Sequence, residues 1–246
     1  MGKPGSQTLE RSPRFLTHLR GHLLLFDRKP MPLHPASADL RLLLIACVLE
    51  AIRLGLVKWL YPTVPLLILV LLPLGCALLL VRFVAGLHLS QIGFYPWHKW
   101  TATEKSYFVQ LLIIANIVFP LVFGPRLRAL FAQHFALEAM VDIFIPYLFF
   151  GFYQEVVYRG ILQSALVRPC GVFIGILAAN VLYTFGPLHW NYFFSPVSLA
   201  VPMFASIFAI GLFFGVLFNR SGNLWIVAVI HGIGNAYIVT SLASGR

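Results

Sequence analysis

The feature that most constrains this chain is a series of apolar stretches that are close to the length of a membrane span. A helix needs about 20 consecutive, mostly apolar residues to cross a bilayer. From residue 40 onward such stretches follow one another, at about 42–60, 64–87, 107–123, 138–166, 171–188, 197–218 and 222–244. We therefore expect an all-α polytopic membrane protein with about seven transmembrane helices, within a range of about six to eight.

The charge content excludes the main alternatives. Only 11% of the 246 residues are charged and 59% are hydrophobic, whereas soluble domains carry about 25% charged residues. So few charges cannot cover the surface of a soluble enzyme, and the composition is equally unlike a disordered chain. The three cysteines (Cys47, Cys76 and Cys170) lie in or beside apolar segments without metal-site spacing, which indicates packing and not disulfides.

The basic residues are unevenly distributed, because seven of the 18 Lys and Arg residues lie in the first 41 positions. This bias favours a cytoplasmic N-terminus and attraction to anionic lipids. No basic-aromatic module accompanies it, so we expect no nucleic-acid partner. We predict a basic cytoplasmic or interfacial segment at 1–38 and a single transmembrane domain at 39–246. For the membrane itself, we favour a bacterial inner membrane over a eukaryotic endomembrane.

Polar residues inside the spans are costly and are therefore candidates for function. Glu50 and Arg53 lie three residues apart in the first span, and we expect an ion pair within the helix. Asn116 stands alone in the third span, where an interhelical hydrogen bond is the simplest interpretation. A short amphipathic connector before the fourth span is predicted to open with Gly124, Pro125, Arg126 and Arg128.

The fourth and fifth spans each carry a polar cluster. Glu155 and Arg159 lie four residues apart on one helical face, in the order that favours an ion pair. The fifth span ends at His189, and Pro187 breaks the helix just before it. Such a break frees backbone groups that must find partners or line a wet cavity. Each cluster alone is compatible with a structural role.

The seventh span adds His231 and Asn235, which also share a helical face, and Gly232 and Gly234, which allow a close approach. Convergence of the three clusters on one buried polar pocket is the economical interpretation. At 1.5 Å per residue the predicted boundaries put His189 more than roughly 10 Å from the other groups along the membrane normal. Convergence therefore requires tilted helices or different helix boundaries.

The three clusters together resemble a known family. Gln154-Glu155-x-x-x-Arg159, Phe185-x-x-x-His189 and His231-x-x-x-Asn235 are similar to the ordered motifs Glu-Glu-x-x-x-Arg, Phe-x-x-x-His and His-x-x-x-Asn of the CPBP family. This family comprises CAAX-prenyl endopeptidases and bacteriocin-processing or self-immunity (Abi) proteases. The resemblance covers residues 138–243. It implies a CPBP-type catalytic helix core and intramembrane cleavage of a lipidated or hydrophobic peptide near its terminus.

The resemblance implies a catalytic group of Gln154, Glu155, His189, His231 and Asn235. The family's first glutamate is the general base, but the amide of Gln154 cannot take up a proton at ordinary pH. Three explanations remain open: a deliberate change that traps an inactive form, a natural variant in which Glu155 is the base, or a pseudoprotease that scaffolds membrane partners. A small transporter is a further alternative, although the chain has no internal repeat.

The remaining roles also follow from the resemblance. The two histidines would orient the attacking water or share its proton, and Asn235 would donate a hydrogen bond to the oxyanion. Arg159 would hold the neighbouring carboxylate ionised or bind the substrate's C-terminal carboxylate. Substrate-binding or supporting roles are assigned to Arg159, Phe185 and Tyr158. We expect no cofactor, and the alternative is a zinc ion held by His189, His231 and Glu155. The expected partners are the lipid bilayer and a membrane-embedded or lipidated substrate.

Overall fold

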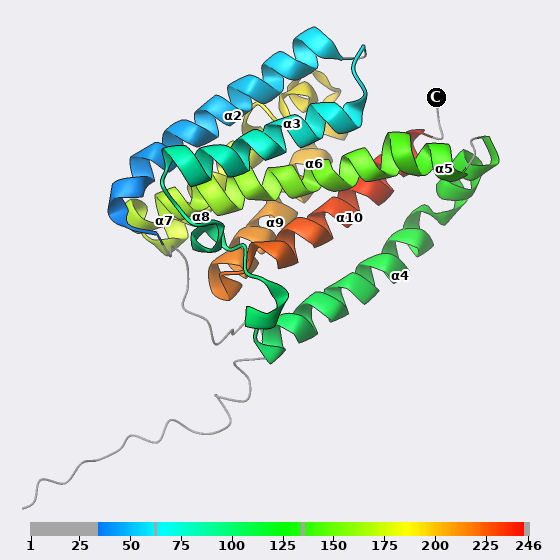
Figure 1. Ribbon diagram of the computed structural model, residues 1–246. Coiled ribbons are helices and arrows are strands. Elements are labelled where there is room, and N and C mark those ends of the chain that lie inside the picture. Colours follow the sequence, from blue (N-terminus) through cyan, green and yellow to red (C-terminus); the bar gives the residue numbers. More distant parts are fainter. Residues whose placement is uncertain (1–33, 62, 134–135, 244–246) are drawn as a thin grey trace, which may run out of the picture.

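The computed structural model describes residues 34–61, 63–133 and 136–243, which form helices without any β-strand. Seven helical segments follow the seven predicted spans in order (Figure 1), which confirms the all-α class. They are α2 (Asp39–Leu60), α3 (Leu66–Leu79) with η2 (Leu80–Val84), α4 (Ala102–Gln133), a composite fourth segment, α8 (Val172–Phe185), α9 (Val197–Ser221) and α10 (Leu224–Ala243). The composite segment comprises α5 (Ala136–Ala139), η5 (Met140–Phe144), α6 (Ile145–Glu155), η6 (Val156–Gln163) and α7 (Ser164–Cys170).

Short 3-10 turns complete the described chain, namely η1 (Ala36–Ala38), η3 (Leu89–Ile92), η4 (Trp97–Lys99) and η7 (Trp190–Phe194). Most of the predicted N-terminal segment, residues 1–33, lies outside the described residues. The division into an N-terminal segment and one transmembrane domain therefore stays a prediction.

Within the described residues, four helical segments are long and apolar enough to cross a membrane: Leu66–Val84, Ala102–Pro125, Met140–Cys170 and Val197–Ser221. The segments Val172–Phe185 and Leu224–Ile238 are apolar but shorter. With 14 residues, α8 is about 21 Å long, which is less than the hydrocarbon thickness of about 30 Å. In a bilayer, α8 therefore ends before it has crossed, and the polar residues beyond its end can lie at membrane depth.

The composite segment runs through the middle of the molecule, with α2 and α3 on one side and α9 and α10 on the other (Figure 1). Its closest partner is α10, and two glycines explain why. A Cβ atom added to Gly151 of α6 would lie 2.7 Å from the Cα atom of Gly232 in α10, so the two backbones touch. Small residues are a common means of close helix packing in membranes. The contact brings together the helices that carry the first and third motifs.

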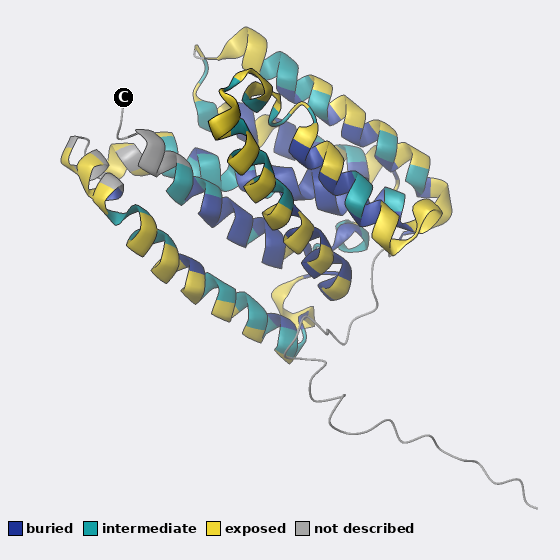
Figure 2. Cartoon of the chain, turned by 180° about the vertical axis from the view of Figure 1, so that it is seen from behind, coloured by how far each residue is buried: buried dark blue, intermediate teal, exposed yellow. Residues whose placement is uncertain are grey.

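The predicted connector after the third span is wrong. Gly124 and Pro125 lie inside α4, which continues without interruption to Gln133. Proline is tolerated in membrane helices because local adjustments and neighbouring groups satisfy the freed carbonyl. Most of α4 is exposed (Figure 2), and among the helices it packs mainly against α10. The burial colours show that the core lies instead around the composite segment and α10.

Two polar predictions outside the motifs are confirmed. Arg53 Nη2 lies 2.7 Å from Glu50 Oε2, so the two residues form an ion pair within α2. The Tyr237 hydroxyl of α10 donates a hydrogen bond to Asn116 Oδ1 of α4 over 3.1 Å. This bond fastens the peripheral helix α4 to the centre of the bundle.

Candidate active site

The first motif lies where α6 passes into the π-helical segment η6. Gln154 and Glu155 are the last two residues of α6, and Arg159 follows within η6. π-Helical turns within α-helices occur frequently at functional sites. Every residue of η6 is buried. The polar side chains of this segment are therefore directed into the protein, where each needs a partner.

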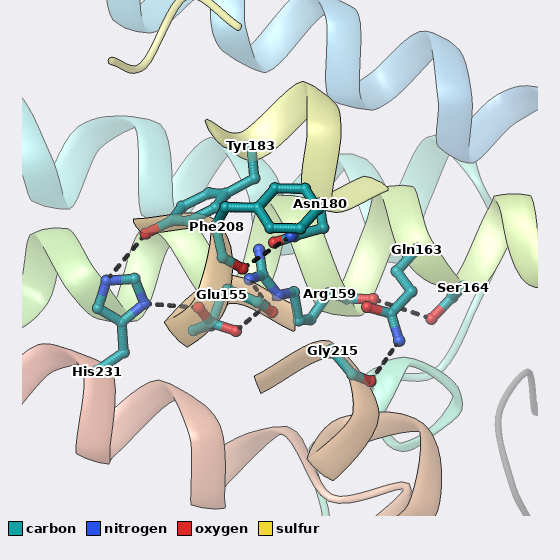
Figure 3. Close-up of polar contacts among 10 residues, drawn as sticks. Glu155, Arg159, Gln163, Ser164, Asn180, Tyr183, Phe208, Gly215 and His231 are labelled. Carbon is teal, nitrogen blue, oxygen red and sulfur yellow. Dashed lines mark hydrogen bonds and ion pairs between the residues drawn. The ribbon is translucent and has the colours of Figure 1, made fainter. Parts of the chain in front are cut away.

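The Glu155 carboxylate lies between two basic side chains (Figure 3). Its Oε1 is 2.5 Å from Nδ1 of His231 in α10, and its Oε2 is 3.3 Å from Nε of Arg159. Glu155 is 0% exposed and Arg159 is 1% exposed. A buried carboxylate without a counter-charge would cost several kcal/mol. The predicted pairing of Glu155 with Arg159 is thus present, and the third motif joins the same network.

Gln154 is held by the other residue of the third motif. Asn235 Nδ2 donates a hydrogen bond to Gln154 Oε1 over 2.8 Å, and Gln154 is only 2% exposed. Neighbouring residues of α6 thus contact His231 and Asn235, which are one turn apart on α10. The amide of Gln154 accepts this hydrogen bond as a carboxylate would, but it cannot serve as a proton acceptor.

His189 reaches the network through Tyr183 of α8. His189 Nδ1 is 2.9 Å from the Tyr183 carbonyl oxygen, and the two rings are 5.0 Å apart. The Tyr183 ring is also 6.0 Å from the His231 ring, and its hydroxyl is 3.4 Å from His231 Nε2. Tyr183 therefore contacts both histidines. Sequence reasoning missed it, because a tyrosine in an apolar helix gives no signal of this role.

The depth conflict expected from the sequence disappears because α8 ends at Phe185. The chain then turns back, and the His189 N–H lies 3.3 Å from the Gly186 carbonyl oxygen. This turn brings the His189 ring against the end of the helix that precedes it. The predicted end of the fifth span at 188 was too late, and the break at Pro187 is the reason that His189 can approach the other motifs.

Two glycines of α9 hold η6 in place (Figure 3). Arg159 Nη2 donates to the Gly211 carbonyl over 2.8 Å, and Gln163 Nε2 donates to the Gly215 carbonyl over 2.9 Å. Arg159 and Gln163 are four residues apart in η6, as are Gly211 and Gly215 in α9. Two successive turns of η6 therefore face two successive turns of α9. A Cβ atom on Gly211 would lie 3.0 Å from Arg159 Nη2. These residues were also missed, although two glycines four apart in an apolar helix are a packing signal.

The residues predicted to support the site lie in different environments. Tyr158 is 2% exposed and meets the Tyr183 ring edge-on at 5.3 Å. The Arg159 guanidinium lies 4.4 Å from the centre of the same ring. Both residues therefore support the network from inside the protein. Phe185, by contrast, is 43% exposed and lines a cavity.

This cavity has a volume of about 440 Å³ and lies beside the loop that carries His189. Its lining comes from α2 and from the end of α8 through η7, and consists of Leu54, Phe185, Gly186, Pro187, Trp190 and Phe193. The lining is predominantly apolar. An apolar group bound there would sit next to the loop of the second motif.

A zinc ion does not fit the arrangement of the candidate ligands. Glu155 contacts Nδ1 of His231, so its carboxylate cannot also bind a metal ion held by Nε2 on the other side of the same ring. Zinc needs its ligands to converge at about 2.0–2.3 Å from one point. Within the described part of the chain, no three His, Cys, Asp or Glu side chains form such a group. We therefore derive no step through a metal.

Comparison with known proteins supports the resemblance found in the motifs. Residues 135–237 match a family model described as type II CAAX prenyl endopeptidase Rce1-like. The matched segment extends from just before the composite helix to Tyr237 in α10, and it contains all three motifs. No curated protein and no solved structure matches the chain. Residues 135–237 are thus similar to CAAX-type endopeptidases, and the long apolar helices indicate an integral membrane protein.

Proposed function

We propose that this chain, whose residues 135–237 are Rce1-like, is an intramembrane endopeptidase that cleaves a lipidated or hydrophobic membrane peptide near its terminus. The observation that carries the proposal is the connected network of Glu155, His231, Tyr183 and His189, drawn from three separate helical segments. A buried carboxylate with two histidines and a flanking amide is a suitable set for activating water.

The network offers a role for each motif residue in hydrolysis of a peptide bond. The imidazoles of His189 and His231 can orient a water molecule, because each keeps Nε2 free of a protein carbonyl or carboxylate. Asn235 Nδ2 carries two hydrogens, and one of them bonds to Gln154. The other can stabilise the oxyanion, a contribution of roughly 3–4 kcal/mol for a preorganised donor in a dry site.

The cavity supports the proposed substrate class. It is apolar, has a volume of about 440 Å³, and is lined by Trp190, the residue next to His189. Binding of an apolar side chain or lipid group there would hold the neighbouring peptide bond close to the second motif. A soluble, polar peptide would gain nothing from this cavity, because burying polar groups without partners is unfavourable.

The proposal is tested by reconstituting the protein in liposomes and assaying cleavage of C-terminal peptides with and without a covalent lipid. The chain with Gln154 and the Gln154→Glu variant are compared in parallel, with His189→Ala in each background as the inactive control. We expect cleavage of lipidated or strongly apolar peptides and none of matched polar peptides. If neither protein cleaves any peptide while both are folded, the protease proposal is refuted.

A second candidate function is favoured by one observation, the neutral side chain of Gln154. A pseudoprotease would keep the same hydrogen bond to Asn235 and would bind a membrane peptide without cleaving it. In the liposome assay this alternative predicts that only Gln154→Glu is active, while both proteins retain the same apolar peptide.

We further propose that the N-terminus is cytoplasmic and that the membrane is a bacterial inner membrane. The excess of Lys and Arg before residue 42 supports this orientation. Labelling of cysteines introduced singly near each end, from either side of the membrane, tests it. Labelling of an N-terminal cysteine from the outside would contradict the orientation.

A further inference from the structure

A protease with this site needs a group that takes a proton from water, and residue 154 cannot supply it. The Gln154 side chain is a neutral amide that already accepts a hydrogen bond from Asn235. The other candidates in the network are Glu155, His189 and His231. Their contacts differ enough to decide among them.

The Glu155 carboxylate is enclosed by two basic side chains. Its Oε1 contacts His231, and its Oε2 forms an ion pair with Arg159 but no hydrogen bond. The residue is 0% exposed, so neither oxygen is accessible from the surface of the protein. This arrangement makes Glu155 a partner of a base and not the base itself.

The partners of the two histidines fix which ring nitrogen carries hydrogen. Carboxylate and carbonyl oxygens cannot donate, so Nδ1 is the protonated nitrogen in both rings and Nε2 is the acceptor. His231 donates to the Glu155 carboxylate over 2.5 Å, whereas His189 donates to the neutral carbonyl of Tyr183 over 2.9 Å. A carboxylate stabilises the imidazolium that forms when the ring takes a proton, as the aspartate does in serine proteases. A neutral carbonyl does so much less.

We propose that His231 is the general base of this chain, oriented by Glu155, and that this dyad takes over the task of the missing carboxylate at position 154. The inference rests on the proposed endopeptidase function. The neighbour of His231 Nε2 is the Tyr183 hydroxyl at 3.4 Å, which is a long hydrogen bond. A water molecule can therefore compete for this nitrogen.

The step balances within the site. The water oxygen bonds to the peptide carbonyl carbon, its proton passes to His231 Nε2, and the carbonyl electron pair becomes an oxyanion. The carbon–nitrogen bond of the tetrahedral intermediate then breaks, and the proton on His231 passes to the departing amine. The products are a carboxylic acid and an amine, and His231 returns to its neutral form beside Glu155.

Two amide replacements of His231 separate proton transfer from a positioning role. His231→Asn keeps a donor near the Nδ1 position for Glu155, and His231→Gln places an amide near the Nε2 position for the water. Neither amide can accept a proton at neutral pH. We expect both variants to lower kcat by about 10²–10⁴-fold, with little change in KM, in liposomes with a lipidated peptide. The matched control is Thr184→Val, because Thr184 is buried in α8 and its hydroxyl has no hydrogen-bond partner among the described residues.

Glu155→Gln and the double variant Glu155→Gln/His231→Gln test whether the two residues act as a unit. Members of one catalytic unit are not additive, so we expect the double variant to be no slower than either single one. The inference is overturned if His231→Gln keeps kcat within tenfold, if the losses add, or if only Gln154→Glu is active. Absence of cleavage by both the chain with Gln154 and Gln154→Glu would instead refute the proposed function. Thermal unfolding in detergent shows whether each variant is folded, and His231→Asn keeps the test valid if Glu155→Gln does not fold.

Discussion

Replacement of Gly211 by alanine should change the free energy of unfolding in opposite directions through helix propensity and through the packing of α9. On propensity alone, Gly→Ala in a helix stabilises by about 1 kcal/mol. In α9, however, the added Cβ would lie 3.0 Å from both Arg159 Nη2 and Tyr183 Cδ1, and closer still to the side chain of Asn180. The Asn180 side chain must therefore move, and the guanidinium must shift as well, which weakens its hydrogen bond to the Gly211 carbonyl.

The expected magnitude follows from these contacts. Losing a buried hydrogen bond from a charged donor costs about 1.5–3 kcal/mol, and overpacking adds about 1–3 kcal/mol. After subtracting the gain of about 1 kcal/mol from propensity, we expect Gly211→Ala to lower the free energy of unfolding by about 1.5–5 kcal/mol. Since Arg159 contacts Glu155, peptide cleavage should decrease as well.

The assay is equilibrium unfolding in mixed micelles, with Gly75→Ala as the matched control. Gly75 lies in α3, and a Cβ there would meet nothing within 4 Å. This control should therefore be neutral or stabilising by up to about 1 kcal/mol. If Gly211→Ala behaved like Gly75→Ala, α9 would not hold the guanidinium by close contact, and our account of the site would be wrong.

Three further predictions concern other parts of the network. Tyr183→Phe should keep cleavage within about tenfold, because it removes only the long hydroxyl contact to His231; a complete loss would show that the hydroxyl itself takes part in catalysis. Glu50→Gln should destabilise the protein by about 3–5 kcal/mol, because it leaves the buried Arg53 without a counter-charge. In the same unfolding assay, the double variant Glu50→Leu/Arg53→Met should recover most of this loss. Cleavage by the chain with Gln154 should be unaffected by a strong chelator, since no three His, Cys, Asp or Glu side chains of the described residues converge as zinc ligands; inactivation that zinc reverses would contradict this.

Much of the site could be inferred from local spacing. The i, i+4 spacing of Glu155 and Arg159, and of His231 and Asn235, puts each pair on one helical face. Pro187 likewise predicts a helix break before His189. By contrast, Tyr183 could not be selected from the sequence, because tyrosines are common in membrane helices. The spacing of Gly211 and Gly215 indicates close packing but does not identify the partner helix.

The sequence by itself determined the class of protein and the order of its helices, because bilayer thickness imposes a length on each apolar segment. It also determined which few polar groups are available inside the bundle. Only the tertiary structure decided how these groups pair: Glu155 with His231, Gln154 with Asn235, and His189 with the carbonyl of Tyr183. The physical reason is that the first two pairs depend on the approach and rotation of helices whose paired residues lie 76 and 81 residues apart in the chain, and the third depends on how the chain turns after α8 ends. Local periodicity carries no information about those quantities.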